Sequence, residues 1–192
     1  MREETDDRFG RAVFLDRDGV LNRTIVRSGK RTSPRTLAEV EMMVGAERGC
    51  STLRAAGYVL VMVTNQPEIA RGLQKAESLD EINRWLSERL RIQSVKVCPH
   101  DDQDGCDCRK PKPGMILEAA KELGINLRRS YLVGAVFEFG QQSAWAVSGG
   151  GRTAAIRGGG IVVETPAGRG LRIRGRRAEL ALAGGHPGTA GG

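Results

Sequence analysis

Two aspartates, Asp16 and Asp18, stand two positions apart and are followed at once by Gly19. They come directly after Ala12-Val-Phe-Leu15, an apolar run that is typical of a buried strand. Ligands of open α/β sheets bind at the carboxyl ends of strands, so these carboxylates are candidates for a site. One carboxylate could attack as a nucleophile, the other could transfer a proton, and Mg²⁺ would neutralise a phosphate beside them. A plain turn after a strand explains the same residues about equally well.

A second group of residues has the spacing C-x-H-x₅-C-x-C and comprises Cys98, His100, Cys106 and Cys108. Three thiols and one imidazole are the right number and type of ligand for a closed tetrahedral zinc site, which would be structural. Free thiols are the alternative. A disulfide is disfavoured, because nothing in the sequence places the chain in an oxidising compartment. The fourth cysteine, Cys50, falls in a predicted helix and is expected in the core.

Two further segments carry groups that suit an anion. Thr64 and Asn65 end a predicted strand and could donate to phosphate oxygens, although, taken alone, a capped strand–helix turn explains them better. Arg109 and Lys110 precede a predicted helix, and cations at a helix N-terminus form an anion site. Taken alone, this second segment is more often a solvated basic loop.

Strands and helices alternate along the first 133 residues. Strand-like runs lie at 12–15, 58–63, 95–97 and 131–133, with one more at 161–163. Helical patterns occupy 45–56, the residues from the Ser78–Glu81 capping-box pattern to Leu90, and 113–123. This alternation predicts the α/β class, with a three-layer α/β/α arrangement around a Rossmann-like parallel sheet.

The composition changes at Gly134. Residues 134–192 hold 7 Arg, 3 Glu and 16 of the 26 glycines, with no Lys and no Asp. Much of the net charge of +7 therefore belongs to this stretch rather than to a folded basic face, so nucleic-acid binding is disfavoured. We expect a charged extension at 1–11, a domain at 12–163 and a disordered Gly/Arg-rich tail at 164–192.

The sequence also bears on location. No apolar run approaches the roughly 18 residues that a membrane helix needs, and the charged start of the chain does not resemble a signal peptide. We therefore expect a cytoplasmic protein that acts as a monomer and has no membrane partner.

Together these motifs resemble the haloacid-dehalogenase superfamily over about residues 12–133, and within it the heptose bisphosphate phosphatases. The resemblance is carried by Asp16-Arg-Asp-Gly19, Thr64-Asn-Gln66, the C-x-H…C-x-C loop and Cys108-Arg-Lys-Pro-Lys-Pro-Gly-Met115, in this order. It implies Mg²⁺-dependent removal of the 7-phosphate of D-glycero-D-manno-heptose 1,7-bisphosphate through an aspartyl-phosphate. A related zinc-bearing branch hydrolyses histidinol phosphate, so that compound or another small phosphomonoester is the alternative substrate.

The resemblance also implies roles for single residues. Asp16 would be the nucleophile and Asp18 the general acid and base, and both would bind Mg²⁺. Thr64 and Lys110 would hold the phosphoryl oxygens. The pocket for the phosphosugar substrate would be lined by Arg27 of the segment 24–27, Asn65, Gln66, Pro67 and Arg109. Zinc would be bound by Cys98, His100, Cys106 and Cys108.

The chain departs from the family pattern after 131–133. The superfamily motif Gly-Asp-x-x-x-Asp, whose first Asp binds Mg²⁺, is replaced by Gly134-Ala-Val-Phe-Glu-Phe139, so that Ala135 offers no side-chain oxygen. Glu68 follows Thr64-Asn-Gln-Pro67, where a small residue would be easier to place beside a phosphate. An impaired phosphatase and a phosphosugar-binding protein without turnover are both compatible with this departure. A change of reading frame near Gly134 would explain it as well.

Overall fold

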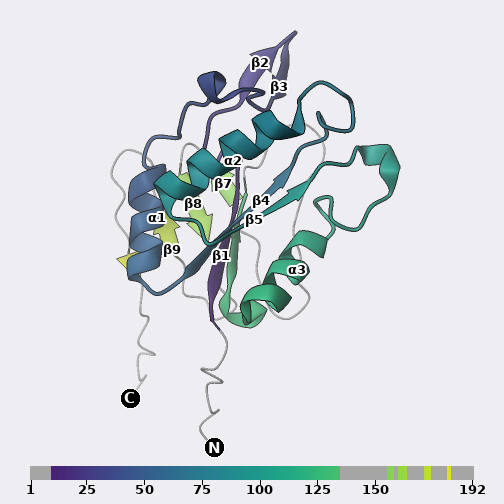
Figure 1. Ribbon diagram of the computed structural model, residues 1–192. Coiled ribbons are helices and arrows are strands. Elements are labelled where there is room, and N and C mark those ends of the chain that lie inside the picture. The colour runs from purple at the N-terminus through teal and green to yellow at the C-terminus, as the bar shows by residue number, and fades with distance from the viewer. Residues whose placement is uncertain (1–9, 135–154, 158–159, 164–170, 174–180, 183–192) are drawn as a thin grey trace, which may run out of the picture.

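The computed structural model of the protein describes residues 10–134, 155–157, 160–163, 171–173 and 181–182. Its centre is a four-stranded sheet in the order β5-β4-β1-β6, and every pairing in it is parallel (Figure 1). The strands are β1 (Ala12–Asp16), β4 (Val59–Asn65), β5 (Ser94–Cys98) and β6 (Tyr131–Val133). The helices are α1 (Ala46–Ala55), α2 (Ala76–Leu90) and α3 (Gly114–Leu123).

Both faces of this sheet are covered, because successive side chains of a strand point to opposite faces. Val13 and Leu15 of β1 pack in one apolar cluster with residues of α1 and α2, including Cys50 and Ile82. Phe14 packs in a second cluster on the other face, with residues of α3. The predicted three-layer α/β/α arrangement around a parallel sheet is therefore confirmed.

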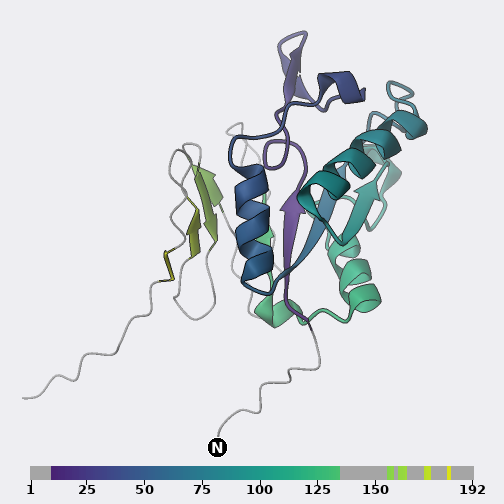
Figure 2. The ribbon, with the colours of Figure 1, turned by 60° about the vertical axis from the view of Figure 1, so that its left-hand side comes forward.

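A flap lies between β1 and α1 in the chain. We use this name for residues Ile25–Glu39, which comprise the antiparallel hairpin of β2 (Ile25–Arg27) and β3 (Lys30–Thr32) and the 3₁₀ turn η1 (Leu37–Glu39). The hairpin projects beyond the carboxyl end of β1 (Figure 2). It is not part of the core sheet, and the turn residue Ser28 has a positive φ of 50°.

The predicted helices and strands of the core sheet are found within one to three residues of their expected bounds. The prediction of a capping box at Ser78–Glu81 is wrong, because α2 begins at Ala76 and its N-cap residue is Lys75, which has an extended backbone. Leu79 N donates to Lys75 O (3.2 Å), so Ser78 already lies inside the first turn. A capping box exists instead between Asp101 and Asp104, at the 3₁₀ turn η2 (Asp102–Asp104).

A second sheet is antiparallel and has the order β10-β9-β8-β7. Its strands are β7 (Ala155–Arg157), β8 (Gly160–Val163), β9 (Leu171–Ile173) and β10 (Ala181–Leu182). The strand expected at 161–163 is thus present, although outside the parallel sheet. β9 and β10 are regular structure in a stretch expected to be disordered, and the domain boundaries at 11 and 163 stay predictions.

The remaining helical turn of the core, η3 (Leu127–Arg129), leads into β6. Among the described residues, no helix has the length and apolar character needed to cross a bilayer.

Candidate active site and metal centre

Asp16 ends β1 and meets a lysine from a distant loop. Lys110, in the segment before α3, places its Nζ 2.5 Å from Asp16 Oδ1 and also donates to Val63 O (3.2 Å). Burial raises the pKa of Asp16, the Lys110 ammonium partly offsets this, and the neighbouring Asp18 carboxylate adds to the rise. Sequence motifs far apart in the chain therefore converge on one carboxylate.

Asn65 holds the backbone of this lysine. Its Nδ2 donates to Lys110 O (3.1 Å), and Lys110 N donates to Asn65 Oδ1 (3.0 Å). Both ends of the side-chain amide thus bind the backbone of one residue, its N–H and its carbonyl group. The structure gives Asn65 the task of fixing Lys110, whereas the resemblance implies that it lines the substrate pocket.

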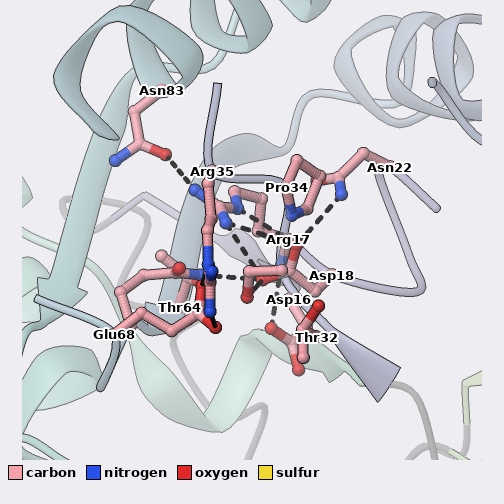
Figure 3. A network of polar contacts seen from close by, with 12 residues as sticks. Asp16, Arg17, Asp18, Asn22, Thr32, Pro34, Arg35, Thr64, Glu68 and Asn83 are labelled. Carbon is pink, nitrogen blue, oxygen red and sulfur yellow. Dashed lines mark hydrogen bonds and ion pairs between the residues drawn. The ribbon is translucent and has the colours of Figure 1, made fainter. Parts of the chain in front are cut away.

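Asp18 is surrounded by hydrogen-bond donors (Figure 3). Asn22 Nδ2 (2.9 Å) and Arg17 bind Oδ1, while Gln66 Nε2 (2.7 Å) and Ser33 Oγ (2.9 Å) bind Oδ2. The Arg17 guanidinium also forms an ion pair with Oδ2 at 3.2 Å. Burial opposes ionisation of Asp18, but the charge of Arg17 and the hydrogen bonds outweigh it, so the pKa of Asp18 is lowered.

Arg17 is the buried cation of the site, with no exposed side-chain surface. Its Nη1 donates to Asn83 Oδ1 (3.0 Å) on α2, which ties the turn after β1 to that helix. Sequence reasoning missed both residues. The available signal was a cation between two acids at the end of a buried strand, since such a charge needs partners in the interior.

The end of β4 brings Thr64 and Gln66 to the same place. Thr64 is fully buried, and its Oγ1 accepts from Gln66 Nε2 (2.7 Å). Pro67 is half-buried and begins the following turn, where its carbonyl accepts from Arg71 N (3.1 Å). Asn22 Oδ1 and Gln66 Oε1, amide oxygens of two side chains that contact Asp18, have no hydrogen-bond partner among the described residues.

Two predicted substrate residues are engaged elsewhere. Arg27 Nη1 donates to Thr32 Oγ1 (2.6 Å) and Ser33 O (2.9 Å), and its Nη2 pairs with Glu39 at 2.5 Å, all within the flap. These described contacts join Arg27 to the flap itself rather than to Asp16 or Asp18.

Arg109 is held by the loop that carries the cysteines. Its Nε pairs with Asp102 Oδ1 (2.6 Å), and its Nη1 donates to His100 O (3.2 Å). The described contacts of Arg109 therefore fix it against the loop that carries the cysteines, and Arg109 precedes Lys110 in the chain.

Cys98, His100, Cys106 and Cys108 form one cluster, with their four ligand atoms within 4.8 Å of one another. Four of the six pairs of ligand atoms are separated by 3.2 Å (His100 Nδ1 to Cys108 Sγ) to 3.7 Å (Cys98 Sγ to His100 Nδ1). A tetrahedral zinc ion with ordinary Zn–S and Zn–N bonds separates its ligands by about 3.5–3.8 Å. Burial raises the pKa of Cys98 to about 12, and a cation bound here would favour its thiolate. The donor set and spacing therefore fit a metal ion.

The loop around this cluster is tightly packed onto α3. Gly114 N donates to Asp107 O (3.2 Å), and a Cβ on Gly114 would lie 2.3 Å from that same oxygen. A glycine is therefore required where the metal-binding loop meets the start of the helix.

The sheet order, the acidic pair after the first strand and the flap that follows it define a Rossmann-like phosphatase of the haloacid-dehalogenase class. A heptose 1,7-bisphosphate phosphatase from B. bronchiseptica, solved with magnesium and phosphate, matches with TM-score 0.53 and 30% identity over 61% of this chain and 65% of that chain. A HAD-like phosphatase from Mesorhizobium loti matches with TM-score 0.54 and 31% identity over 65% of this chain and 62% of that one. The matches thus span slightly less than two thirds of either solved chain.

Sequence similarity gives the finer class. The chain is 37% identical over 135 residues to the D-glycero-beta-D-manno-heptose-1,7-bisphosphate 7-phosphatase of Pasteurella multocida, covering 65% of this chain and 70% of that protein. It is 34% identical over 150 residues to the enzyme of the same name from Photorhabdus laumondii, covering 72% and 77%. No general model of a protein family matches the chain. The chain belongs to the D-glycero-beta-D-manno-heptose-1,7-bisphosphate 7-phosphatase family of HAD-type phosphatases.

Two glycine substitutions test the packing of the metal-binding loop. We expect Gly114→Ala to lower the free energy of unfolding by about 2 kcal/mol, because the new methyl group overlaps backbone atoms of Asp107. We expect Gly49→Ala, inside α1 and in open space, to raise it by about 1 kcal/mol. Urea unfolding of both variants measures the difference. Equal behaviour of the two variants would contradict the close approach.

Proposed function

We propose that this chain hydrolyses a phosphomonoester, and that its substrate is D-glycero-β-D-manno-heptose 1,7-bisphosphate, from which it removes the 7-phosphate. The observation that carries this proposal is the half-buried pair of Asp16 and Lys110, at 2.5 Å, beside the donor-rich carboxylate of Asp18. The names of the relatives supply the sugar. Histidinol phosphate, the alternative substrate, has no support from these relatives.

In the first step, a carboxylate oxygen of Asp16 forms a bond to phosphorus while the bond between phosphorus and the sugar oxygen breaks. Lys110 offers its charge to the phosphoryl oxygens as they gain negative charge, and Thr64 contributes a hydroxyl at the end of β4. Asp18, whose pKa is lowered in the chain alone, takes up a proton when the negatively charged phosphate binds beside it, and gives this proton to the departing sugar oxygen. The product of the step is an aspartyl-phosphate on Asp16 and a free sugar hydroxyl.

In the second step, Asp18 takes a proton from water while the water oxygen attacks phosphorus. The bond between phosphorus and Asp16 breaks, which releases inorganic phosphate and restores the Asp16 carboxylate. Asp18 is then protonated again and is ready for the next turnover. Arg17 and the amides of Asn22 and Gln66 donate to this group in its ionised form.

The residues of this site fit Mg²⁺. Two carboxylates and neighbouring amide oxygens are hard ligands of the kind Mg²⁺ prefers, and two buried amide oxygens beside Asp18 have no described partner. Asp16 would bind the ion by its side chain and Asp18 by its backbone carbonyl. When bound, Mg²⁺ neutralises charge on the transferred phosphoryl group.

We further propose that the Cys/His cluster binds zinc in a structural role. Its four ligands leave no open position for water, and the loop carries Arg109 and Lys110 directly after the last ligand. Zinc would thereby fix the wall of the site from which Lys110 reaches Asp16. Monomeric state and cytoplasmic location stay predictions.

Phosphate release tests the proposed reaction. We expect release from the heptose bisphosphate in the presence of Mg²⁺ and its complete loss in Asp16→Asn, because the amide cannot form the aspartyl-phosphate. Asp80→Asn, an exposed acid on α2, is the matched control and should leave the rate unchanged. Binding of the bisphosphate without any release by the unmodified chain would instead support a phosphosugar-binding protein without turnover.

The departure at Ala135 supplies a second test, although this residue and Glu138 lie outside the described residues. We expect Ala135→Asp to lower the Mg²⁺ concentration needed for half-maximal activity by about tenfold, because a carboxylate is added where the superfamily motif has a ligand. A titration of activity with Mg²⁺ measures this. An unchanged Mg²⁺ requirement would indicate that the backbone here does not follow the family.

Zinc content tests the cluster. We expect Cys106→Ser to lose zinc after dialysis and to unfold at a lower temperature, because one thiolate ligand is removed. Cys50→Ser, in the core between α1 and the sheet, should keep about one zinc per chain despite some loss of stability. Metal analysis by mass spectrometry distinguishes the two variants, and equal zinc content in both would refute the assignment.

A further inference from the structure

The flap reaches the catalytic carboxyl group through one short segment. We call Ser33–Arg35 the strap, because it runs from the end of β3 toward the turn that follows β4. Ser33 Oγ donates to Asp18 Oδ2 (2.9 Å), and the middle residue, Pro34, is buried. The strap thus joins a hairpin outside the core to the group that transfers the proton.

The far end of the strap is fastened by a two-point ion pair. Arg35 Nη2 lies 2.9 Å from Glu68 Oε1, and Arg35 Nε lies 3.1 Å from Oε2 (Figure 3). Gln74 Nε2 adds hydrogen bonds to the carbonyls of Pro34 (3.2 Å) and Arg35 (3.0 Å). Such a two-point contact fixes orientation as well as distance, because both planar groups must align.

The Arg35–Glu68 pair explains how the carboxylate of Glu68 can be buried near the expected phosphate position. Glu68 is only 6% exposed and follows the Thr64–Pro67 segment where the phosphate is expected. An unpaired carboxylate here would repel a phosphate and would be costly to bury. The guanidinium of Arg35 cancels its charge, so Glu68 acts as an anchor for the strap.

Ser33 differs chemically from the other groups on Asp18. The contacts from Arg17, Asn22 and Gln66 are N–H donors, which suit the ionised carboxylate. A hydroxyl can donate to a carboxylate and can also accept from a carboxylic acid. Ser33 can therefore keep its hydrogen bond to Oδ2 in both protonation states that a general acid and base passes through.

We propose that Ser33, Arg35 and Glu68 are positioning residues for proton transfer by Asp18. The Arg35–Glu68 pair holds the strap in place, and the strap holds Ser33 Oγ on the carboxyl oxygen throughout the reaction. This inference rests on the proposed phosphatase function. It predicts an effect on protonation of the leaving group, and not a general loss of activity.

The test compares two substrates by kcat/KM, which reports the step that expels the leaving group. The sugar oxygen of the heptose bisphosphate is a poor leaving group and needs a proton, whereas the phenolate of 4-nitrophenyl phosphate leaves without one. We expect Ser33→Ala and Glu68→Gln to lower kcat/KM for the bisphosphate by about tenfold or more, and for the aryl phosphate by less than about twofold. Ser33→Ala removes only one hydroxyl, so its fold should be retained.

The control is Glu41→Gln. Glu41 pairs with Arg23 at 2.9 Å in the same stretch between β1 and α1, but both side chains are more than half exposed. This variant should leave both substrates unchanged. As a rescue, the exchange Arg35→Glu with Glu68→Arg should recover part of the loss seen in Glu68→Gln.

Each outcome decides the inference. An equal loss on both substrates, or no loss on either, would overturn it while leaving the phosphatase function in place. If the unmodified chain released phosphate from neither substrate, the proposed function would be overturned, and this inference with it. A selective loss on the bisphosphate, absent in Glu41→Gln, supports the positioning role.

Discussion

Burial of two carboxylates at the end of one strand is the constraint on which the rest of the site depends. Asp16 and Asp18 repel each other and lose hydration, so each needs a cation within the protein. Arg17 supplies one from the same turn and is itself tied to α2. Lys110 supplies the other from the loop that follows β5. The position of its ammonium group therefore depends on the conformation of that loop.

The Cys/His cluster meets this need for an ordered loop. Residues 99–113 contain one short 3₁₀ turn and little apolar surface, so hydrophobic packing alone would not fix them. Two features order this loop in place of an apolar core. The side chains of the Cys/His cluster lie within 4.8 Å of one another, and Gly114 lies close to the backbone of Asp107. Asn65 then clamps the peptide of Lys110 to the end of β4. The proposed zinc binding, the packing of the loop and the position of the Lys110 ammonium group therefore depend on one another.

Local patterns predicted most of the core sheet and its helices, because apolar periodicity and glycine stops are short-range signals. The Cys/His cluster was predictable too, since Cys98 to Cys108 lie close in sequence. The network on Asp18 was not, because Ser33 and Asn83 reach it from an irregular flap and from a helix face that look ordinary in sequence. Glu68 was noticeable as an acid near a phosphate, but its partner Arg35 is fixed only by tertiary structure.

The balance of charges in the site bears on the absence of a carboxylate at position 135. Two carboxylates in the site are matched by two cations, Arg17 and Lys110, so the protein groups cancel. As long as Asp18 is ionised, one Mg²⁺ would then neutralise a doubly charged phosphate. An aspartate at position 135, as in the superfamily motif, would strengthen the proposed metal binding. Without it, the ion is bound more weakly by the protein, and the phosphate itself becomes a larger share of what holds the metal.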